Sequence, residues 1–275
     1  MNHQTNSIGF IGTGNMAQAI ILALHQNGYS PIVASDSCAQ QLQKVAPFCA
    51  GVTHNNAVAA DCNYVFLCVK PQMAKEVLQN LHFKPNTILI SIMAGTTIDT
   101  LLSYCNAKKI VRVMPNLNTS VKASHNAYCH TNNVKDTYLH QLLSTFGRAK
   151  YVEESMMDAV TGISGSGPAY VFRFFKGLVL AAQKEGFSPR EAIDLCCDLL
   201  TGSSKNIANA YTLLPDESNF NQVIDLIDTM TNNVCSKGGT TIEGVTYLDA
   251  NHFSDHVANA ALKAVARAKE LSKPK

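Results

Sequence analysis

The chain has 275 residues, of which 46% are hydrophobic and 15% charged, and its formal net charge is +2. This composition allows one large domain or two smaller ones with an ordinary buried core. The near-neutral balance and the absence of a long Lys/Arg run argue against nucleic acid or an anionic membrane surface as a partner.

The nine cysteines are scattered, and no C-x-x-C occurs. Neither zinc-ribbon nor redox-motif spacing is therefore present, and we expect reduced thiols in a cytoplasmic protein without a metal site. His252 and His256 stand four apart, but solvated side chains explain them better than a metal pair does. The polar start MNHQTNS has no signal-peptide pattern, and no apolar run reaches the ~20 residues that span a bilayer.

Short apolar runs alternate with segments of helical period up to about residue 160. The runs predicted as strands are SIGFIG (7–12), PIVASD (31–36), NYVFLCV (63–69), TILISIM (87–93) and KIVRVM (109–114). This alternation indicates a parallel sheet of βαβ units, and the apolar runs suit strands that are covered on both faces. We predict the α/β class, with an N-terminal Rossmann dinucleotide-binding domain over residues 1–160.

The first predicted strand runs into a glycine pattern, in which Gly12, Gly14 and Ala17 occupy the G-x-G-x-x-[G/A] positions. Gly12 allows a sharp turn, and Gly14 allows the backbone to approach a pyrophosphate. Ala17 lets the following helix pack closely on the sheet, and the N-terminus of that helix receives the phosphate charge. The pattern predicts a dinucleotide-binding fingerprint.

Asp36 ends the second predicted strand, about 20 residues beyond the fingerprint, where a carboxylate accepts hydrogen bonds from the ribose of NAD. The same carboxylate would repel the 2′-phosphate of NADP, whereas the neighbouring Ser35 and Ser37 would tolerate it. Alternatively, Asp36 is a turn residue or caps the next helix. The preference between NADPH and NADH stays open at this point.

Three further strand ends carry turn residues where an open α/β sheet places its ligand cleft. They are Val69-Lys70-Pro71, Ala94-Gly95-Thr96 and Met114-Pro115-Asn116. Each alone reads as a plain strand-to-helix turn. Because three successive carboxyl ends share one edge of the sheet, we expect them to line a cofactor cleft.

Strand-like runs disappear after Thr161, and we predict a helical second domain over residues 161–275. Ser188, Pro189 and Glu191 form a helix-start signature. The helix opened by Pro168 is apolar nearly all round, so we expect a second subunit to cover it. A last helix is predicted from Ser254 to about Leu271.

The stretch NVCSKGGTTIEGV (233–245) reads as a glycine loop that runs into a helix. Thr240 and Glu243 have capping-box spacing, so we expect the helix to begin near Thr241, directly after Gly238-Gly239. Backbone N–H groups at such a helix start attract an anion, and a carboxylate suits the site. Together with a nicotinamide, this predicts hydride transfer to a small acid.

Six motifs, in this order over nearly the whole chain, resemble the Δ1-pyrroline-5-carboxylate reductase family: GFIGTGNMAQAI, VKPQ, SIMAGTTI, RVMPN, DAVTGISGSGPAY and SKGGTTIEG. A generic Rossmann enzyme shares only the first. The resemblance implies a Rossmann domain followed by a helical dimerisation domain. It also implies a cytoplasmic homodimer, or larger homo-oligomer, that reduces 1-pyrroline-5-carboxylate to L-proline, the last step of proline biosynthesis. The usual cofactor would be NADPH, with NADH possible.

The residue patterns and the resemblance together predict two sets of binding residues. The cofactor set comprises Ile11, Gly12, Thr13, Gly14, Asn15, Met16, Ser35, Asp36, Asn55, Val69, Lys70, Pro71, Ala94, Gly95, Asn116 and Asn233. The substrate set comprises Ser236, Gly238, Gly239, Thr240 and Thr241. By motif position Thr241 is the catalytic hydroxyl, which orients the ring nitrogen while solvent supplies the proton.

Two departures from the family pattern leave alternatives open. Lys237 stands where the family loop has Pro, and Leu117-Asn118 stand where it has Thr-Pro. Such changes would also suit a non-catalytic paralogue that binds a dinucleotide. A β-hydroxyacid-dehydrogenase relative would use Lys176, but the Gly-x-x-Gly-x-x-x-Lys setting of that lysine is absent.

Overall fold

The computed structural model describes residues 6–134, 136–215 and 217–273. Most of the polar start that was read as lacking a signal peptide therefore lies outside the described residues. The chain forms two compact units, one of residues 1–168 with 261–275 and one of residues 169–260. The units divide the chain at Pro168 and return the last residues to the first unit, whereas the predicted boundary at residue 160 remains a prediction.

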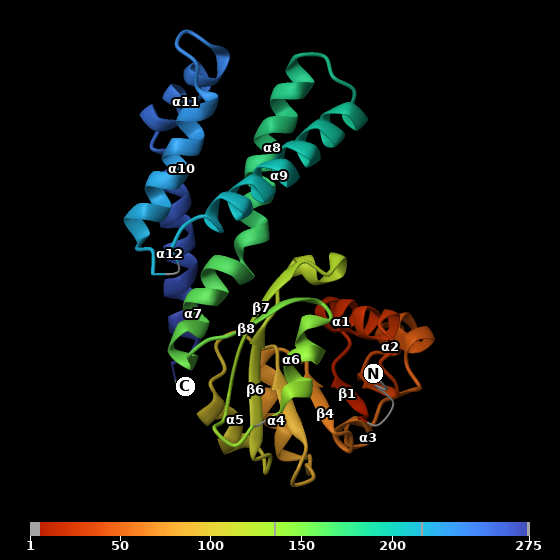
Figure 1. Cartoon of the computed structure of the whole chain (residues 1–275). Coiled ribbons are helices and arrows are strands. Elements are labelled where there is room, and N and C mark those ends of the chain that lie inside the picture. Colours follow the sequence, from red (N-terminus) through yellow and green to blue (C-terminus); the bar gives the residue numbers. More distant parts are fainter. Residues whose placement is uncertain (1–5, 135, 216, 274–275) are drawn as a thin grey trace. The chain divides into compact units, whose positions relative to one another are not determined.

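The first unit is built on one eight-stranded sheet of order β3-β2-β1-β4-β5-β6-β7-β8 (Figure 1). The strands are β1 (Ile8–Ile11), β2 (Ile32–Ser35), β3 (Gly51–Thr53), β4 (Tyr64–Leu67), β5 (Ile88–Ser91), β6 (Lys109–Met114), β7 (Ser124–His130) and β8 (Gly147–Tyr151). All five predicted strands are confirmed. The expectation of a parallel sheet holds from β1 to β6 but is wrong beyond, because β7 runs antiparallel to β6 and β8 is parallel to β7.

The register of the central strands sets where a ligand can lie. Ile11, the last residue of β1, is paired with Ser35 of β2 on one side and with Leu67 of β4 on the other. The three strands therefore end at the same level, and the turns that follow them share one edge of the sheet. In parallel α/β sheets this edge carries the ligand site.

Helices cover both faces of this sheet. On one face lie α1 (Asn15–Gln26), α2 (Ala39–Val45) and α6 (Thr137–Ser144), which bury their apolar side chains against Phe10 and Phe66. These two rings stack with their centroids 4.7 Å apart. On the other face lie α3 (Asn56–Ala60), α4 (Ala74–Gln79), α5 (Ile98–Tyr104) and α7 (Met157–Val160). Full burial of each large apolar side chain contributes about 1.5–3 kcal/mol.

Short helical turns complete the connections between these elements. They are η1 (Ala46–Phe48), η2 (Pro71–Met73), η3 (Leu117–Val121), η4 (Glu154–Met156) and the π-helix η5 (Thr161–Gly165). A β-carbon on Gly162, within η5, would lie 2.5 Å from Val265 of α12 (Phe253–Leu271). Gly95 has φ +68°, and a β-carbon there would lie 2.7 Å from Leu271. The C-terminal part of α12 thus packs directly on two glycines of the first unit.

The second unit is helical, as predicted, and contains most of α8 (Gly167–Lys184), α9 (Pro189–Tyr211), α10 (Phe220–Val234), α11 (Thr240–Ala250) and the start of α12 (Figure 1). The capping box at Ser188 is confirmed, and the hydrogen bonds from Ser188 lower the pKa of the Glu191 carboxyl. The last helix begins at Phe253, one residue ahead of the predicted Ser254. Within the ranges that the structure describes, no helix is both long and apolar enough to cross a membrane.

Candidate functional site

The turn after β1 has the geometry of a phosphate-binding turn. Gly12 adopts φ +92°, and a β-carbon there would lie 2.9 Å from the carbonyl oxygen of Cys68, so the fold itself requires glycine. Gly14 is different, since a β-carbon would meet nothing within 4 Å. Gly14 is also the N-cap of α1 and offers that helix no side-chain cap. Open space therefore lies over free N–H groups at a helix N-terminus, which suits a pyrophosphate.

Asp36 does not turn its carboxylate outward. Its Oδ2 accepts hydrogen bonds from the backbone N–H of Thr13, at 2.7 Å, and from the Thr13 hydroxyl, at 3.0 Å. Its Oδ1 accepts the N–H of Cys38 at 2.8 Å. The carboxylate thus ties the end of β2 to the fingerprint turn and supports the turn that leads into α2. These contacts favour the alternative reading of Asp36 as a turn residue.

Ser35 is also engaged inside the sheet. Its side chain is fully buried, and its hydroxyl donates a hydrogen bond to the carbonyl oxygen of Phe10, 3.1 Å away. The sequence-based idea that Ser35 tolerates a ribose phosphate does not agree with this orientation, because a buried hydroxyl cannot reach a ligand at the sheet edge.

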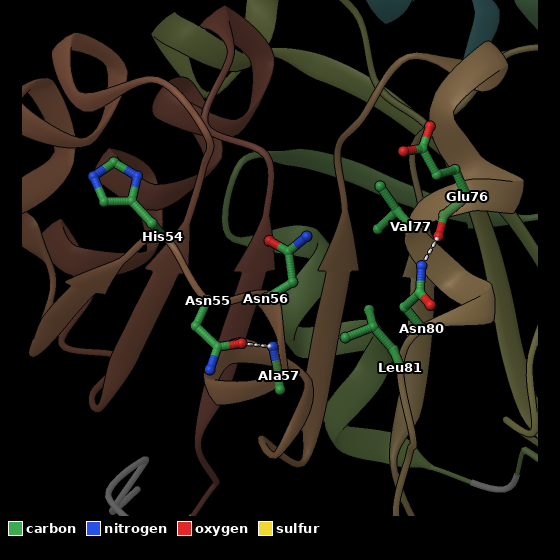
Figure 2. Close-up of a pocket in the computed structure, with 8 residues that line it drawn as sticks. All are labelled: His54, Asn55, Asn56, Ala57, Glu76, Val77, Asn80 and Leu81. Atoms are coloured by element: carbon green, nitrogen blue, oxygen red, sulfur yellow. Dashed lines mark hydrogen bonds between the residues drawn. The ribbon is translucent and has the colours of Figure 1, made fainter.

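A polar pocket of about 300 Å³ lies between the start of α3 and α4 (Figure 2). It is lined by His54, Asn55, Asn56, Ala57, Glu76, Val77, Asn80 and Leu81. The side chain of Asn55, a predicted cofactor residue, accepts the N–H of Ala57 at 3.0 Å and so caps α3. The pocket follows β3, which is the neighbour of β2, and it therefore lies on the side of the fingerprint where a dinucleotide places its adenosine half.

Two other predicted cofactor residues, Lys70 and Asn116, follow strand ends, and Asn116 forms hydrogen bonds within the protein. Lys70 is exposed and precedes Pro71 at the start of η2. Asn116 is 7% exposed, and both ends of its amide are used within the protein. Its Oδ1 accepts the N–H of Asn118 at 3.0 Å, and its Nδ2 donates to the carbonyl oxygen of Ser164 at 3.1 Å. The structure thus assigns the Asn116 side chain to anchoring the turn after β6 to η5.

Sequence reasoning missed an ion pair between the buried Arg112 and the half-buried Glu154. Arg112 of β6 is 2% exposed, and its Nη1 lies 2.7 Å from Oε1 of Glu154. The same oxygen accepts the N–H of Ile98, the first residue of α5, at 2.8 Å. The pair therefore joins β6, the start of α5 and η4. A lone Arg in an apolar strand and a distant Glu carry no motif, so nothing in the sequence pairs them.

The predicted substrate residues lie in the second unit, between α10 and α11. Gly238 adopts φ +70°, and Gly239, in an extended conformation, is the N-cap of α11. A β-carbon on Gly239 would collide with the Ser236 hydroxyl. The predicted capping box between Thr240 and Glu243 is wrong, because the two glycines bring the chain into the helix one residue earlier and no side chain caps it. The first N–H groups of α11, beside a half-buried Thr241, are consequently left for a ligand.

Comparison with known proteins covers both parts of the chain. A family model described as pyrroline-5-carboxylate reductase dimerisation matches residues 154–271, and a model described as NADP oxidoreductase coenzyme F420-dependent matches residues 7–95. The pyrroline-5-carboxylate reductase of Aquifex aeolicus is 32% identical, over 97% of this chain and 98% of that protein. The enzyme of Haemophilus influenzae is 34% identical, over 98% of each chain. The chain belongs to the pyrroline-5-carboxylate reductase family.

Solved structures of pyrroline-5-carboxylate reductases share the whole architecture. The Streptococcus pyogenes protein matches with a TM-score of 0.81 and 27% identity, covering 98% of this chain and 100% of that chain. The Plasmodium falciparum protein, solved with NADP bound, matches with a TM-score of 0.84 and 28% identity, covering 98% and 99%. The Rossmann fold and the helical dimerisation domain expected from the sequence are both confirmed.

Proposed function

We propose that this protein is a pyrroline-5-carboxylate reductase that transfers a hydride from NAD(P)H to the C=N carbon of 1-pyrroline-5-carboxylate and so makes L-proline. One observation carries the proposal: a chain with a formed dinucleotide turn also presents an uncapped helix start behind Gly238-Gly239, with Thr241 in its first turn. Membership of the reductase family supports the same reaction.

The residues of the first unit fit a dinucleotide. The open space at Gly14 and the uncapped N-terminus of α1 would hold the pyrophosphate, and the pocket at Asn55 would hold the adenosine half. The remaining cofactor residues stay as predicted: Ile11, Thr13, Asn15, Met16, Val69, Lys70, Pro71, Ala94, Gly95 and Asn233. When bound, the reduced nicotinamide supplies the hydride that the substrate receives at C2, the carbon of its C=N bond, which becomes C5 of proline.

The second unit would orient the substrate. The N–H groups at the start of α11 form the positive end of the helix dipole, and this end favours a carboxylate. Thr241 would donate a hydrogen bond to, or accept one from, the ring nitrogen, and solvent would supply the proton. A threonine hydroxyl is too weak an acid to do so at neutral pH, so this protein's contribution is placement of the reacting carbon.

We further propose a cytoplasmic homodimer formed through the helical unit. Large apolar side chains remain open to solvent on one chain alone: Phe172 is 54% exposed, Ile224 53% and Tyr247 70%. An apolar cleft of about 540 Å³ lies between α8, α9 and α12 and is lined by Phe174, Leu200, Val257 and their neighbours. Apolar surface of this extent is characteristic of an obligate interface, and a second copy would cover it.

The proposal is tested by following nicotinamide absorbance when purified protein is mixed with NADPH or NADH, with and without 1-pyrroline-5-carboxylate. Oxidation that requires the imine, with L-proline as the product, is the expected result. Dinucleotide binding without turnover would contradict the proposal and support a non-catalytic paralogue. Sedimentation or light scattering on the same sample tests the dimer, and a monomer would contradict it.

A further inference from the structure

We propose that His54 binds the 2′-phosphate of NADPH and thereby sets the preference of this protein between NADPH and NADH. The inference rests on the proposed dinucleotide site, and it assigns to His54 the discrimination that the sequence pattern assigned to Asp36 and Ser35. It follows from where the three side chains direct their polar atoms.

The two residues at the end of β2 have little left to offer a ribose phosphate. Both carboxylate oxygens of Asp36 accept hydrogen bonds from Thr13 or Cys38. The hydroxyl of Ser35 is buried and donates its hydrogen bond to the carbonyl oxygen of Phe10. The exposed Ser37 remains as a hydroxyl donor, but a positively charged group for the phosphate must come from a neighbouring element.

His54 lies directly beside this position. It follows Thr53, the last residue of β3, and β3 pairs with β2 so that Thr53 stands opposite Ser35. The imidazole Nδ1 of His54 lies 2.8 Å from the carbonyl oxygen of Asp36, and the N–H of Asp36 donates to the carbonyl oxygen of Thr53 at 3.2 Å. The ring is thus fixed to the residue that, in this fold, marks the ribose 2′ position.

The hydrogen bond to the Asp36 carbonyl also indicates which ring nitrogen of His54 carries the hydrogen. A carbonyl oxygen can only accept, so Nδ1 carries the hydrogen and Nε2 is the nitrogen that remains for a ligand. His54 is exposed and lines the polar pocket of Figure 2. When Nε2 is also protonated, the ring becomes a cation that can donate to a phosphate dianion.

The acidic residues around this pocket come from two elements. Asp36 lies beside the ring at the end of β2, and Glu76 of α4 lines the same pocket. The Asp36 carboxylate is held by Thr13 and Cys38, so an incoming phosphate is the anion that would pair with a protonated ring. NADH brings no 2′-phosphate, so its affinity gains nothing from the charge.

The first test compares kcat/KM for NADPH with that for NADH in the wild type and in His54→Gln. Because the same variant is measured with both cofactors, the ratio cancels any effect of the substitution on imine binding or on the chemical step. Glutamine keeps a donor for the Asp36 carbonyl but cannot become a cation, so we expect the ratio to fall about tenfold, the size of one charge-assisted hydrogen bond. His125→Gln, on an exposed residue of β7, is the matched control and should leave the ratio unchanged. An unchanged ratio in His54→Gln overturns the inference.

The second test varies pH, because a histidine gains its second proton between about pH 8 and pH 5. The 2′-phosphate itself gains a proton near pH 6, so the comparison uses pH 8 to about 6.5, where the wild-type ratio should rise relative to the ratio in His54→Gln as the pH is lowered. Parallel profiles in the two proteins would overturn the inference.

The third test needs no catalysis. Adenosine 2′,5′-bisphosphate and AMP are titrated into each protein by calorimetry. The wild type should bind the bisphosphate more tightly than AMP, and His54→Gln should lose most of that difference. If the wild type shows no difference, the inference is wrong. If turnover is absent while this difference is present, the proposed reaction fails and the role of His54 stands.

Discussion

The side-chain amide of Asn116 donates a hydrogen bond to the carbonyl oxygen of Ser164, 3.1 Å away. The bond joins the turn after β6 to the π-helix η5, which precedes α8. π-Helices are rare and concentrate at functional sites, where neighbouring contacts must hold them. The Asn116 side chain therefore stabilises the π-helix η5, in addition to lying at the sheet edge predicted to bind the cofactor.

The hydrogen bond between Asn116 and Ser164 leads to a prediction for stability. Asn116→Ala should lower the free energy of unfolding by about 1–3 kcal/mol, because it leaves buried partners without a hydrogen bond. Urea denaturation measures the change. Ser164→Ala is the matched control: it removes only the longer contact to the Ser164 hydroxyl, at 3.4 Å, and keeps the bond to the carbonyl oxygen. Equal losses in the two variants would show that the carbonyl contact does not matter.

Substitution of the two fingerprint glycines should have different effects: one should lower stability, and the other should weaken cofactor binding. Gly12→Ala should destabilise the protein by about 1–3 kcal/mol, because its φ of +92° and the Cys68 carbonyl leave no room for a β-carbon. Gly14→Ala should change stability by less than about 0.5 kcal/mol, since the added carbon meets nothing in the protein. It should instead raise the Kd for NADPH, measured by fluorescence titration. Unweakened NADPH binding by Gly14→Ala would place the pyrophosphate elsewhere.

Asp36 should prove more important for stability than for cofactor choice. The two carboxylate oxygens of Asp36 serve Thr13 and Cys38 separately, and Asp36→Asn replaces one of them with an amide donor. We therefore expect the thermal midpoint to drop and the NADPH to NADH ratio to move less than in His54→Gln. A large change of the ratio with an unchanged melting temperature would return the discrimination to Asp36.

Thr241 should affect turnover and not dinucleotide binding. Thr241→Val removes the hydroxyl at nearly constant volume, and we expect kcat to fall about tenfold or more, as the loss of one hydrogen bond of about 1–2 kcal/mol predicts. The Kd for NADPH should be unchanged. Thr241→Ser, which keeps the hydroxyl, should retain most of the activity. If Thr241→Val has wild-type kinetics, the hydroxyl has no part in the reaction.

Alkaline pH should weaken the first unit. Burial raises the pKa of the Cys49 and Cys129 thiols to about 11, from the ordinary value of 9.0. The folded protein then holds these protons more tightly than the unfolded chain does, so stability is full below pH 9 and declines as the pH rises towards 11. Urea midpoints at intervals between pH 8 and pH 11 measure this. Cys49→Ala should make the decline shallower, and an unchanged slope would exclude Cys49 as a cause.

The strands that sequence patterns predicted are those with both faces buried. β1 and β4 are apolar throughout, β5 is apolar except for Ser91, and all three are buried at every position. The missed strands are β3, β7 and β8. The edge strand β3 has three residues, the edge strand β8 reads GRAKY with a single buried side chain, and β7 reads SHNAYCH, in which polar residues interrupt the apolar ones. Edge strands face solvent on one side, so their composition does not differ from that of a loop.

The candidate site was predictable at the level of backbone and not at the level of side-chain direction. Glycine spacing located the phosphate turn, because that turn imposes backbone requirements that few residues meet. Spacing could not tell that the Asp36 carboxylate turns inward to Thr13, or that His54 stands beside it. His54 belongs to no motif, and only the pairing of β3 with β2 reveals its position. Likewise, Gly239 displaced Thr240 from the cap position that its side chain alone suggested.

The packing of Val265 on Gly162 and of Leu271 on Gly95 has a consequence for biosynthesis. The residues that finish the first unit are translated only after all of the helical unit has been made. A nascent chain therefore carries an incomplete Rossmann unit, with two bare glycine surfaces, until residues 261–271 clear the ribosome. Emergence of residues 261–271, rather than the arrival of the last strand, completes the first unit.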